Sequence, residues 1–504
     1  MRFEQPRRGG DDMKRRDFLQ ASGVFSANLI VGSSLLSIRN AEAATSLPIA
    51  ALKAELDPKK DMVLISGSGA PNKFDYNASY SKRKQITPQV RVVASSAHAV
   101  GQTIRWATGN GISFAVRSGG HSYEGLSQNA DLVIDVRGMA AIQLAADKKS
   151  VAIGAGASLG AVYAALEPAH LAIPAGSCFP VGVAGHSLGG GFGLLGRPFG
   201  LACDSVLSME VVDASGNILK VSGEENPDLF WALRGGGNGS FGVVTQFNFR
   251  TSAVNLVAKF AITWSKPVAQ AARIVLAWQE WLDNLPPAVT CTLHLTKEAG
   301  GVIKVHIAGL SVDSESKLTA EMKRLQKFAG PAEILVTTTM TFARAATIFN
   351  GGGPAYESVL MKGKSDYVTE PMTEQGILTL LDGLQKAPGE IAVLFDSYGG
   401  AINKVASDAT AFVHRGNTKY LIQYFMQWDS PGATETNLAM MRTLYASMRP
   451  YVSGASYVNY CDLDLGDDCA KAYWGDNLTR LMKIKAACDP NNIFRHAQSV
   501  PLGS

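Results

Sequence analysis

The sequence GSCFPVGVAGHSLGGGFGLLGRPFG, at residues 176–200, contains nine glycines among its 25 residues. An earlier turn, RSGGHS, occupies residues 117–122. Backbone without Cβ atoms can approach a large ligand closely, and its N–H groups can point at phosphate oxygens. One histidine, His121, and one cysteine, Cys178, lie inside these stretches, where neither is expected for packing. The two stretches therefore predict loops that enclose a large, phosphate-bearing ligand.

Four motifs in chain order resemble the berberine-bridge-enzyme-like FAD-linked oxidases, a group within the vanillyl-alcohol-oxidase flavoproteins. They are RSGGHS, the glycine-rich stretch continued to residue 204, YVNYCDLDL at residues 457–465, and DPNNIFRHAQSV at residues 489–500. The resemblance runs from about residue 80 to residue 500. It implies FAD attached at two points, with His121 bonded to the 8α-methyl group and Cys178 to C6 of the isoalloxazine.

The resemblance also implies that loops carrying these motifs wrap the FAD, with backbone N–H groups on the pyrophosphate. Two plainer interpretations stay open: His121 as a turn histidine bonded to backbone, and Cys178 as a small buried hydrophobe. The further residues predicted to bind FAD are Arg117, Ser118, Gly119, Gly120, Ser122, Gly176, Gly182, Gly185, His186, Gly189, Gly190, Gly193, Asp204, Gly242, Val244 and Asn459.

The segment YVNYCD resembles the family's Y-x-N-Y-x-D motif, which makes Tyr460 the predicted catalytic base. It would take the substrate hydroxyl proton as hydride leaves for flavin N5. A tyrosine pKa lies near 10, so this role needs nearby groups that stabilise the phenolate. The alternative is an aromatic ring that only packs on the flavin.

Three more catalytic candidates follow from the resemblance. Gln423 lies in an expected strand, residues 420–428, that the family directs at the substrate face of the flavin. Plant members often carry a charged residue in this stretch, but this chain has Leu421, which leaves more of the work to Tyr460. Asp396 and Tyr398 precede two glycines and are expected near the same face, or else in a simple turn at a strand end.

The order of expected elements predicts an α+β fold. Short strands and helices alternate before the glycine-rich stretch, and the strand at residues 114–116 leads directly into RSGGHS. From about residue 258, strands mixed with longer helices favour an antiparallel sheet covered by helices on one face. The expected units are a two-lobed PCMH-type FAD-binding domain at residues 80–255, a substrate-binding domain at residues 256–450, and a C-terminal segment, residues 451–504, that completes the FAD domain.

The N-terminus, residues 1–43, is typical of a twin-arginine signal peptide. It combines KRRDFL at residues 14–19, an apolar run, and AEA at residues 41–43 as a cleavage site. We expect recognition by the twin-arginine export machinery and a periplasmic or extracellular protein. The alternative is a membrane anchor, although the run is shorter than the ~20 apolar residues that a span needs. No later stretch predicts a membrane span.

Composition narrows the remaining classes. The net charge of +4 excludes a strongly basic nucleic-acid-binding protein. Six cysteines among 504 residues are too few for a disulfide scaffold, and the pairing of those other than Cys178 stays open. The cysteine and histidine spacings do not indicate a metal site.

The predicted activity is oxidation of a hydroxyl-bearing carbon, on a carbohydrate or a secondary metabolite, with O₂ as acceptor and H₂O₂ as product. Val181 is compatible with oxygen access. Within the family, an oxidative cyclase, an amine-type oxidase or a dehydrogenase remain alternatives. GHSLG at residues 185–189 matches the G-x-S-x-G elbow of serine esterases, so Ser187 is a remote alternative nucleophile.

Overall fold

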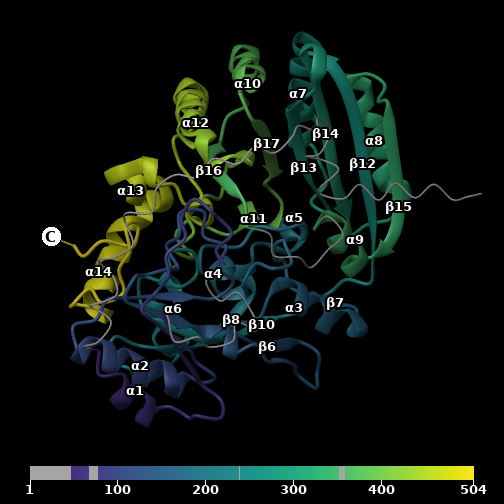
Figure 1. Cartoon of the computed structure of the whole chain (residues 1–504). Coiled ribbons are helices and arrows are strands. Elements are labelled where there is room, and N and C mark those ends of the chain that lie inside the picture. The colour runs from purple at the N-terminus through teal and green to yellow at the C-terminus, as the bar shows by residue number, and fades with distance from the viewer. Residues whose placement is uncertain (1–46, 67–77, 238, 351–357, 504) are drawn as a thin grey trace, which may run out of the picture.

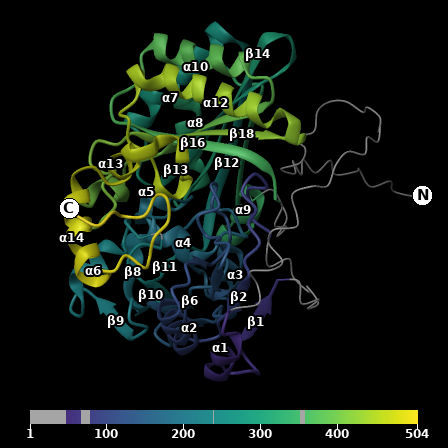
Figure 2. The ribbon, with the colours of Figure 1, turned by 60° about the vertical axis from the view of Figure 1, so that its left-hand side comes forward.

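A computed structural model describes residues 47–66, 78–237, 239–350 and 358–503. The predicted twin-arginine segment lies outside these residues. In Figure 1 the N-terminal half forms a lower lobe, and long strands with their helices form an upper lobe. The last helices, in yellow, run back down beside the lower lobe, an arrangement that Figure 2 shows from another side.

The lower lobe contains two sheets. The first has the order β1-β2-β4-β3, in which β2, β4 and β3 are parallel and β1 is antiparallel to β2. The second has the order β5-β6-β10-β8-β9 and is antiparallel throughout. The strands are β1 (Met62–Ile65), β2 (Val90–Val93), β3 (Phe114–Arg117), β4 (Leu132–Asp135), β5 (Ile142–Leu144), β6 (Ser150–Gly154), β8 (Val206–Val212), β9 (Ile218–Ser222) and β10 (Val243–Arg250).

Local sequence accounts for several boundaries in this lobe. Helix α2 (Ala97–Gly109) begins after Ser96, whose side chain accepts a hydrogen bond from the Ala99 N–H and so satisfies one of the helix's unpaired donors. The expected strand after it is β3, which ends at the first residue of RSGGHS. The predicted strand–helix alternation is confirmed, and β8 and β9 pair as an antiparallel hairpin.

The upper lobe is built on a seven-stranded sheet in which all neighbours are antiparallel, in the order β15-β12-β14-β13-β17-β18-β16. Its strands are β12 (Leu256–Pro267), β13 (Val289–Lys297), β14 (Val302–Ser311), β15 (Ile334–Thr341), β16 (Leu360–Val368), β17 (Glu390–Ser397) and β18 (Tyr420–Trp428). Four helices pack on it: α7 (Val268–Asp283), α8 (Glu315–Ala329), α10 (Glu374–Lys386) and α12 (Thr434–Met448).

These four helices share one hydrophobic core with the sheet, which confirms the predicted antiparallel sheet with helices on one face. The indole rings of Trp264, Trp278 and Trp281 are fully buried in that core. Side chains alternate across a strand, so the opposite face of the sheet carries the other half of each strand's residues. That face is turned toward the lower lobe.

The C-terminal segment contacts the lower lobe through buried polar groups. Helix α14 (Leu478–Cys488) packs on α6 (Pro227–Ala232). From α14, the fully buried Lys485 donates hydrogen bonds to the carbonyls of Ser240 and Phe494, each at 2.7 Å, and pairs with Asp489. The remaining elements are α1 (Ile49–Glu55), α3 (Leu159–Leu166), β7 (Leu171–Ala172), α4 (Val183–Leu188), α5 (Gly196–Phe199), β11 (Ser252–Ala253), α9 (Phe342–Phe349), α11 (Ala401–Lys404) and α13 (Cys469–Trp474).

The cysteines other than Cys178, whose pairing the sequence left open, all lie within the described residues. Cys203, Cys291, Cys461, Cys469 and Cys488 are separate thiols. Burial raises the pKa of the Cys291 thiol to about 11, which makes it an unreactive core group.

Over the described residues, every helix is too short or too polar to cross a membrane.

Candidate active site

A cavity of about 1650 Å³ lies between the glycine-rich loops of the lower lobe and the face of the seven-stranded sheet opposite α7, α8, α10 and α12. It exceeds the ~300–1,000 Å³ of an ordinary small-molecule pocket. One wall is mainly backbone, from the two glycine-rich stretches, and the other is made of side chains from β12 to β18. The cavity is therefore large enough for two ligands side by side.

Two loops are pressed together at the backbone wall. A Cβ atom on Gly119 would lie 2.2 Å from the backbone nitrogen of Gly182, and one on Gly182 would lie 2.2 Å from Ser118 Oγ. Both positions therefore exclude a side chain. This close packing brings the RSGGHS turn and the loop that contains Cys178 to the same side of the cavity.

His121 and Cys178 both line the cavity. The imidazole ring of His121 stacks on Tyr80, with ring centroids 4.8 Å apart and planes at 20°. Cys178 is half-buried, and the next residue, Phe179, donates its N–H to Asn350 Oδ1 at 2.8 Å. The two predicted attachment residues thus share one cavity, where Tyr80 stacks on the His121 ring and Asn350 holds the backbone of the residue after Cys178.

His186 connects the glycine-rich loop to the C-terminal motif. Its Nε2 accepts a hydrogen bond from the Gly176 N–H at 2.9 Å, and its carbonyl accepts one from Asn459 Nδ2 at 2.9 Å. Burial lowers the pKa of His186 to about 4, so the ring is neutral at physiological pH. The neutral imidazole acts as an acceptor that fixes the loop.

The glycines of the backbone wall fit a closely bound dinucleotide. Gly185 lines the cavity, and a Cβ atom there would have no protein atom within 4 Å, so the space in front of it is open to a ligand. Gly193 is different, because its Cβ would lie 1.8 Å from the Ala175 carbonyl oxygen. Some glycines thus let loops pack together, whereas others leave room for the ligand.

Most residues predicted to bind FAD line the cavity. Beside His121 and Cys178 they are Ser118, Gly119, Gly120, Ser122, Gly176, Gly182, Gly185, His186, Gly193, Gly242, Val244 and Asn459.

Four predicted residues lie behind the cavity wall instead. Arg117 donates to the Ala78 carbonyl, and a Cβ on Gly120 would collide with its guanidinium group. Asp204 pairs with the buried Arg415 at 2.6 Å and accepts from the Leu201 N–H at 2.9 Å.

The other two are glycines. A Cβ on Gly189 would lie 2.1 Å from Asn459 Oδ1, and one on Gly190 would lie 2.6 Å from the Phe412 ring. The described contacts of all four residues are structural.

Tyr460 lies in the cavity wall, in a short 3-10 turn formed by Val458–Tyr460. Its ring stacks parallel to Tyr123, with centroids 5.5 Å apart and planes at 2°, and meets Tyr457 edge-on. Tyr123 Oη in turn accepts a hydrogen bond from Gln423 Nε2 at 2.7 Å. The structure thus brings Tyr460 and Gln423 together through Tyr123, a residue that sequence reasoning missed.

Asp396 reaches the same part of the cavity from β17. Burial raises its pKa to about 7, opposed by a hydrogen bond from Thr292 Oγ1 at 3.0 Å. Burial also raises the pKa of Tyr460 well above 10, and the next largest cause is the charge of Asp396. The charge of Asp396 therefore disfavours ionisation of the Tyr460 hydroxyl.

Tyr398 lies one layer behind this site. It is 1% exposed, its hydroxyl is 3.2 Å from that of Tyr367, and its ring stacks on Phe192, which does line the cavity. Leu421, the departure from the plant pattern, is fully buried in the same cluster. We therefore assign Tyr398 to the packing behind the cavity.

The polar side chains of the sheet face were also missed. Thr263, Thr292, His294, His306 and Gln427 all line the cavity. The imidazoles of His294 and His306 face each other across β13 and β14, and His306 Nδ1 lies 2.8 Å from Thr263 Oγ1. Alternation in these strands was visible in the sequence, but which face meets a ligand was not. Only Tyr123 carried a usable signal, because it lies two residues after His121.

The esterase alternative fails on geometry. Ser187 lies inside helix α4, is 1% exposed and does not line the cavity. Its hydroxyl has no hydrogen-bond partner among the described residues, so a base is missing. A nucleophile elbow needs an exposed serine at a strand–helix turn with a histidine in reach. The G-x-S-x-G match is therefore incidental.

Family models match both ends of this arrangement. One described as an FAD binding domain matches residues 88–222, and one described as berberine and berberine like matches residues 456–501. The chain is also 34% identical over 466 residues to berberine bridge enzyme-like 3 of Arabidopsis thaliana, across 85% of this chain and 86% of that protein. The chain belongs to the berberine-bridge-enzyme-like family.

Solved structures agree with this assignment. Berberine-bridge-enzyme-like 1 of Physcomitrella patens has 30% sequence identity and a TM-score of 0.83, covering 90% of this chain and 99% of that one. The grass pollen allergen Phl p 4, described with glucose dehydrogenase activity, has 27% identity, a TM-score of 0.81 and the same coverage. A variant of that allergen is described as a glucose oxidase. The predicted α+β, PCMH-type fold is confirmed, and this berberine-bridge-like protein is an FAD-linked oxidoreductase.

Proposed function

We propose that this berberine-bridge-like enzyme oxidises a hydroxyl-bearing carbon of a carbohydrate or of a secondary-metabolite alcohol. The observation that carries the proposal is that Tyr460, stacked on Tyr123, lines the same cavity as Asp396, whose charge acts on it. A phenol beside a carboxylate can remove a hydroxyl proton, because the carboxylate provides somewhere for the proton to go.

As Tyr460 takes the proton from the substrate oxygen, it would pass its own hydroxyl proton to the Asp396 carboxylate. The buried phenol cannot ionise on its own near neutral pH, since burial raises its pKa well above 10. Asp396 has a pKa of about 7, so its carboxylate form is available at and above neutral pH. Gln423 keeps Tyr123 in place, and Tyr123 presents its flat ring to Tyr460.

FAD, when bound, would accept the hydride from the oxidised carbon and pass both electrons to O₂, which yields H₂O₂. We propose His121 and Cys178 as its two covalent attachment points and the glycine loops as its cradle. Val181 lines the cavity as a small side chain, which is compatible with oxygen access. Peptide mapping of yellow protein tests the tethers: unmodified His121 and Cys178 would contradict them.

The sheet face supports a polyhydroxylated substrate. Thr263, Thr292, His294, His306 and Gln427 offer donors and acceptors spaced along one wall. The glucose dehydrogenase activity described for Phl p 4, and the description of its variant as a glucose oxidase, support a sugar as donor and both acceptor types on this fold. For this chain we propose O₂ as the acceptor.

We also propose export by the twin-arginine route, on the KRRDFL and AEA signals of residues 1–43. Because this route carries folded proteins, the cofactor would be attached before export. Replacing both arginines at positions 15 and 16 by lysine should retain the protein in the cytoplasm. Unchanged export of that variant would contradict the proposal.

The decisive test is anaerobic bleaching of the flavin absorption band by oligosaccharides, simple alcohols, aromatic alcohols and amines. We expect a sugar or another alcohol to bleach the band, and air to restore it with release of H₂O₂. Bleaching by amines alone would contradict the alcohol chemistry. Bleaching without recovery in air would make the enzyme a dehydrogenase.

A further inference from the structure

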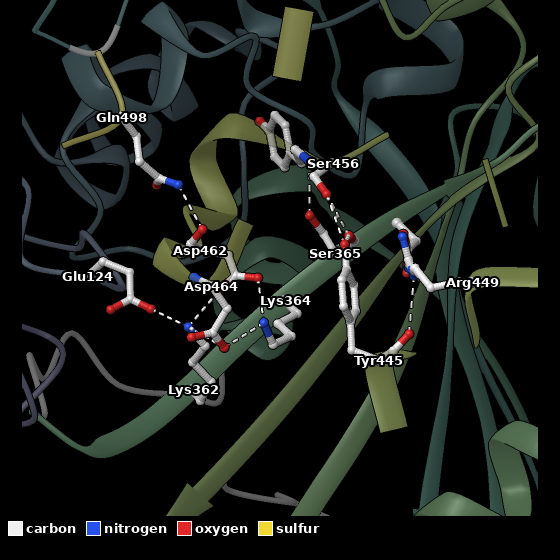
Figure 3. Close-up of polar contacts among 12 residues, drawn as sticks. Glu124, Lys362, Lys364, Ser365, Tyr445, Arg449, Ser456, Asp462, Asp464 and Gln498 are labelled. Atoms are coloured by element: carbon white, nitrogen blue, oxygen red, sulfur yellow. Dashed lines mark hydrogen bonds and ion pairs between the residues drawn. The ribbon is translucent and has the colours of Figure 1, made fainter. Parts of the chain in front are cut away.

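A buried ionic network joins three segments that are far apart in the sequence. It combines a loop of the lower lobe, the edge strand β16 and the C-terminal segment. Figure 3 shows its lysines pointing toward carboxylates of the other two segments. The members of this network are Arg83, Glu124, Lys362, Lys364, Asp462 and Asp464.

Lys362 is the member that connects the two active-site segments. Its Nζ lies 2.5 Å from Glu124 Oε1 and 2.6 Å from Asp462 Oδ1. Lys364 Nζ holds the other oxygen of Asp462 at 2.7 Å, and Asp464 at 2.7 Å. The side chains of Lys362, Glu124 and Asp462 are each at most 3% exposed. Hydrogen bonds between buried charges have well-defined geometry, so this contact can fix positions.

Both carboxylates lie next to a tyrosine of the candidate site. Glu124 directly follows Tyr123, and Asp462 lies two residues after Tyr460. The same strand also touches the first tyrosine, because a Cβ atom on Gly363 would lie 2.6 Å from the Tyr123 ring. Lys362 thus binds a carboxylate close in sequence to each of the two stacked tyrosines.

The charges of the network cancel. Arg83, Lys362 and Lys364 supply three positive charges, and Glu124, Asp462 and Asp464 supply three negative ones. Burial opposes the charge on Lys362, but Asp462 and Glu124 outweigh it and raise the lysine pKa. A fully ionised yet neutral cluster exerts little net field on the phenols, so any effect on the chemistry comes through position.

The backbone of the C-terminal segment is fixed as well. Asp462 donates its N–H to Tyr473 Oη at 3.0 Å and accepts at its carbonyl from Gln498 Nε2 at 2.7 Å. Figure 3 shows Gln498 reaching this carbonyl from the side opposite the lysines. The side chain of Asp462, through Lys362, thus adds an ionic link from this segment to the residue that follows Tyr123.

We propose that Lys362 is a positioning residue that sets the stacking of Tyr123 on Tyr460 by binding Glu124 and Asp462 at once. The consequence for catalysis rests on the proposed function, in which Tyr460 is the base. A displacement of about 1 Å in a catalytic group can cost about 100-fold in rate. Loss of the Lys362 contact should therefore loosen both tyrosines and slow proton removal.

The test compares two double variants of the FAD-loaded full chain. Lys362→Met with Glu124→Gln removes one positive and one negative charge, so the network stays neutral. The matched control is Arg449→Met with Asp366→Asn, an ion pair between the same strand and the segment after α12. Arg449 stacks on Tyr445, not on the two active-site tyrosines.

The first readout needs no substrate. Cys461 lies between Tyr460 and Asp462, is 5% exposed and is 3.5 Å from Ser122 Oγ. Labelling by N-ethylmaleimide, mapped by peptide mass spectrometry, reports how tightly this segment is held. We expect Cys461 to react at least ~10-fold faster in the Lys362 variant, and at the wild-type rate in the control.

The second readout uses the alcohol that bleaches the flavin fastest. The limiting rate of flavin reduction should fall about 100-fold in the Lys362 variant, while the dissociation constant of the alcohol changes less than about three-fold. Faster labelling at Cys461 together with the slower reduction supports the proposal. A wild-type labelling rate overturns it whatever the reduction rate. Faster labelling with unchanged reduction also overturns it, provided that Tyr460→Phe itself slows reduction.

The two readouts separate this proposal from the proposed function. If Tyr460→Phe reduces flavin normally, the base assignment fails, and a wild-type Cys461 labelling rate would still be needed to reject the network. If the double variant does not fold, Glu124→Gln alone carries the same test. It keeps the side-chain shape and should show a smaller acceleration of Cys461 labelling, and no acceleration overturns the proposal.

Discussion

The two walls of the cavity are built in opposite ways. The lower wall is backbone, made of loops whose glycines either touch another loop, as Gly119 and Gly182 do, or face open space, as Gly185 does. The upper wall is a regular sheet face, on which alternate side chains such as His294 and Asp396 point into the cavity. The difference indicates that the two walls have different roles: the backbone wall suits a constant cofactor, and the side-chain wall suits a variable substrate.

The largest expected effect lies on the backbone wall. Gly193→Ala places a Cβ atom 1.8 Å from the Ala175 carbonyl oxygen, so one of the loops must move. We expect a loss of about 3 kcal/mol in the free energy of unfolding and loss of FAD. Chemical denaturation and the flavin absorbance per protein measure these two results.

Gly185→Ala is the matched control on the same wall. No protein atom lies within 4 Å of the added Cβ, and alanine is favoured over glycine in a helix such as α4. The stability of the apoprotein should be unchanged or slightly higher, whereas FAD content should fall. Equal destabilisation by the two variants would end the distinction between packing glycines and ligand-facing glycines.

The next effect concerns the base. Tyr460→Phe should lower the rate of flavin reduction at least ~100-fold and leave FAD content unchanged, because only the hydroxyl is lost. Stopped-flow reduction under anaerobic conditions measures it. Tyr420→Phe is the control: it removes a buried hydroxyl that bonds Gln279 in the helix-covered core, away from the cavity. Full reduction rates in Tyr460→Phe would remove this residue as the base.

Asp396→Asn tests the pH dependence of the side-chain wall. Burial raises the pKa of Asp396 to about 7, so wild-type flavin reduction should rise as pH increases through about 7, when the carboxylate forms. In Asp396→Asn, flavin reduction should be slow and should not rise as pH increases through about 7. A wild-type pH profile in the variant would exclude Asp396 as the proton acceptor.

The same substitution, Asp396→Asn, should slow flavin reduction but stabilise the folded protein above neutral pH. The folded-state pKa lies above the unfolded value near 3.9, so the folded protein loses stability as pH rises from about 4 through about 7. Asparagine removes this cost, and Asp396→Asn should melt at a higher temperature than wild type at pH 8, with little difference at pH 4. Equal differences at both pH values would show that the group is not buried as described.

The smallest effect concerns substrate contacts. His306 is bonded to Thr263, and burial lowers its pKa to about 4, so it is a neutral hydrogen-bonding group. His306→Ala should raise KM about 10-fold, equivalent to ~1.4 kcal/mol, with kcat within about two-fold. The exposed His98 on α2 supplies the control, His98→Ala, which should change neither constant. A fall in kcat alone would place His306 in the chemistry instead.

Sequence reasoning was accurate where a signal is local. The strand at Tyr420–Trp428 was predicted to the residue, because its apolar and aromatic side chains lie within one short window. The cofactor class followed instead from the family resemblance that RSGGHS and the glycine-rich stretch carry. By contrast, Arg117 and Asp204 were predicted to bind FAD, and their described contacts are a loop carbonyl and Arg415.

The sequence by itself determined the α+β element order and the antiparallel upper sheet. These follow from periodicity and spacing within segments, whereas the attachment of FAD at His121 and Cys178 came from the family resemblance and stays a prediction. Only the tertiary structure decided that Tyr123 bonds Gln423, 300 residues away, and that Asp396 approaches Tyr460. Strand register and the docking of the two lobes set these contacts, and both depend on packing energies summed over the whole chain, which no short window of sequence contains.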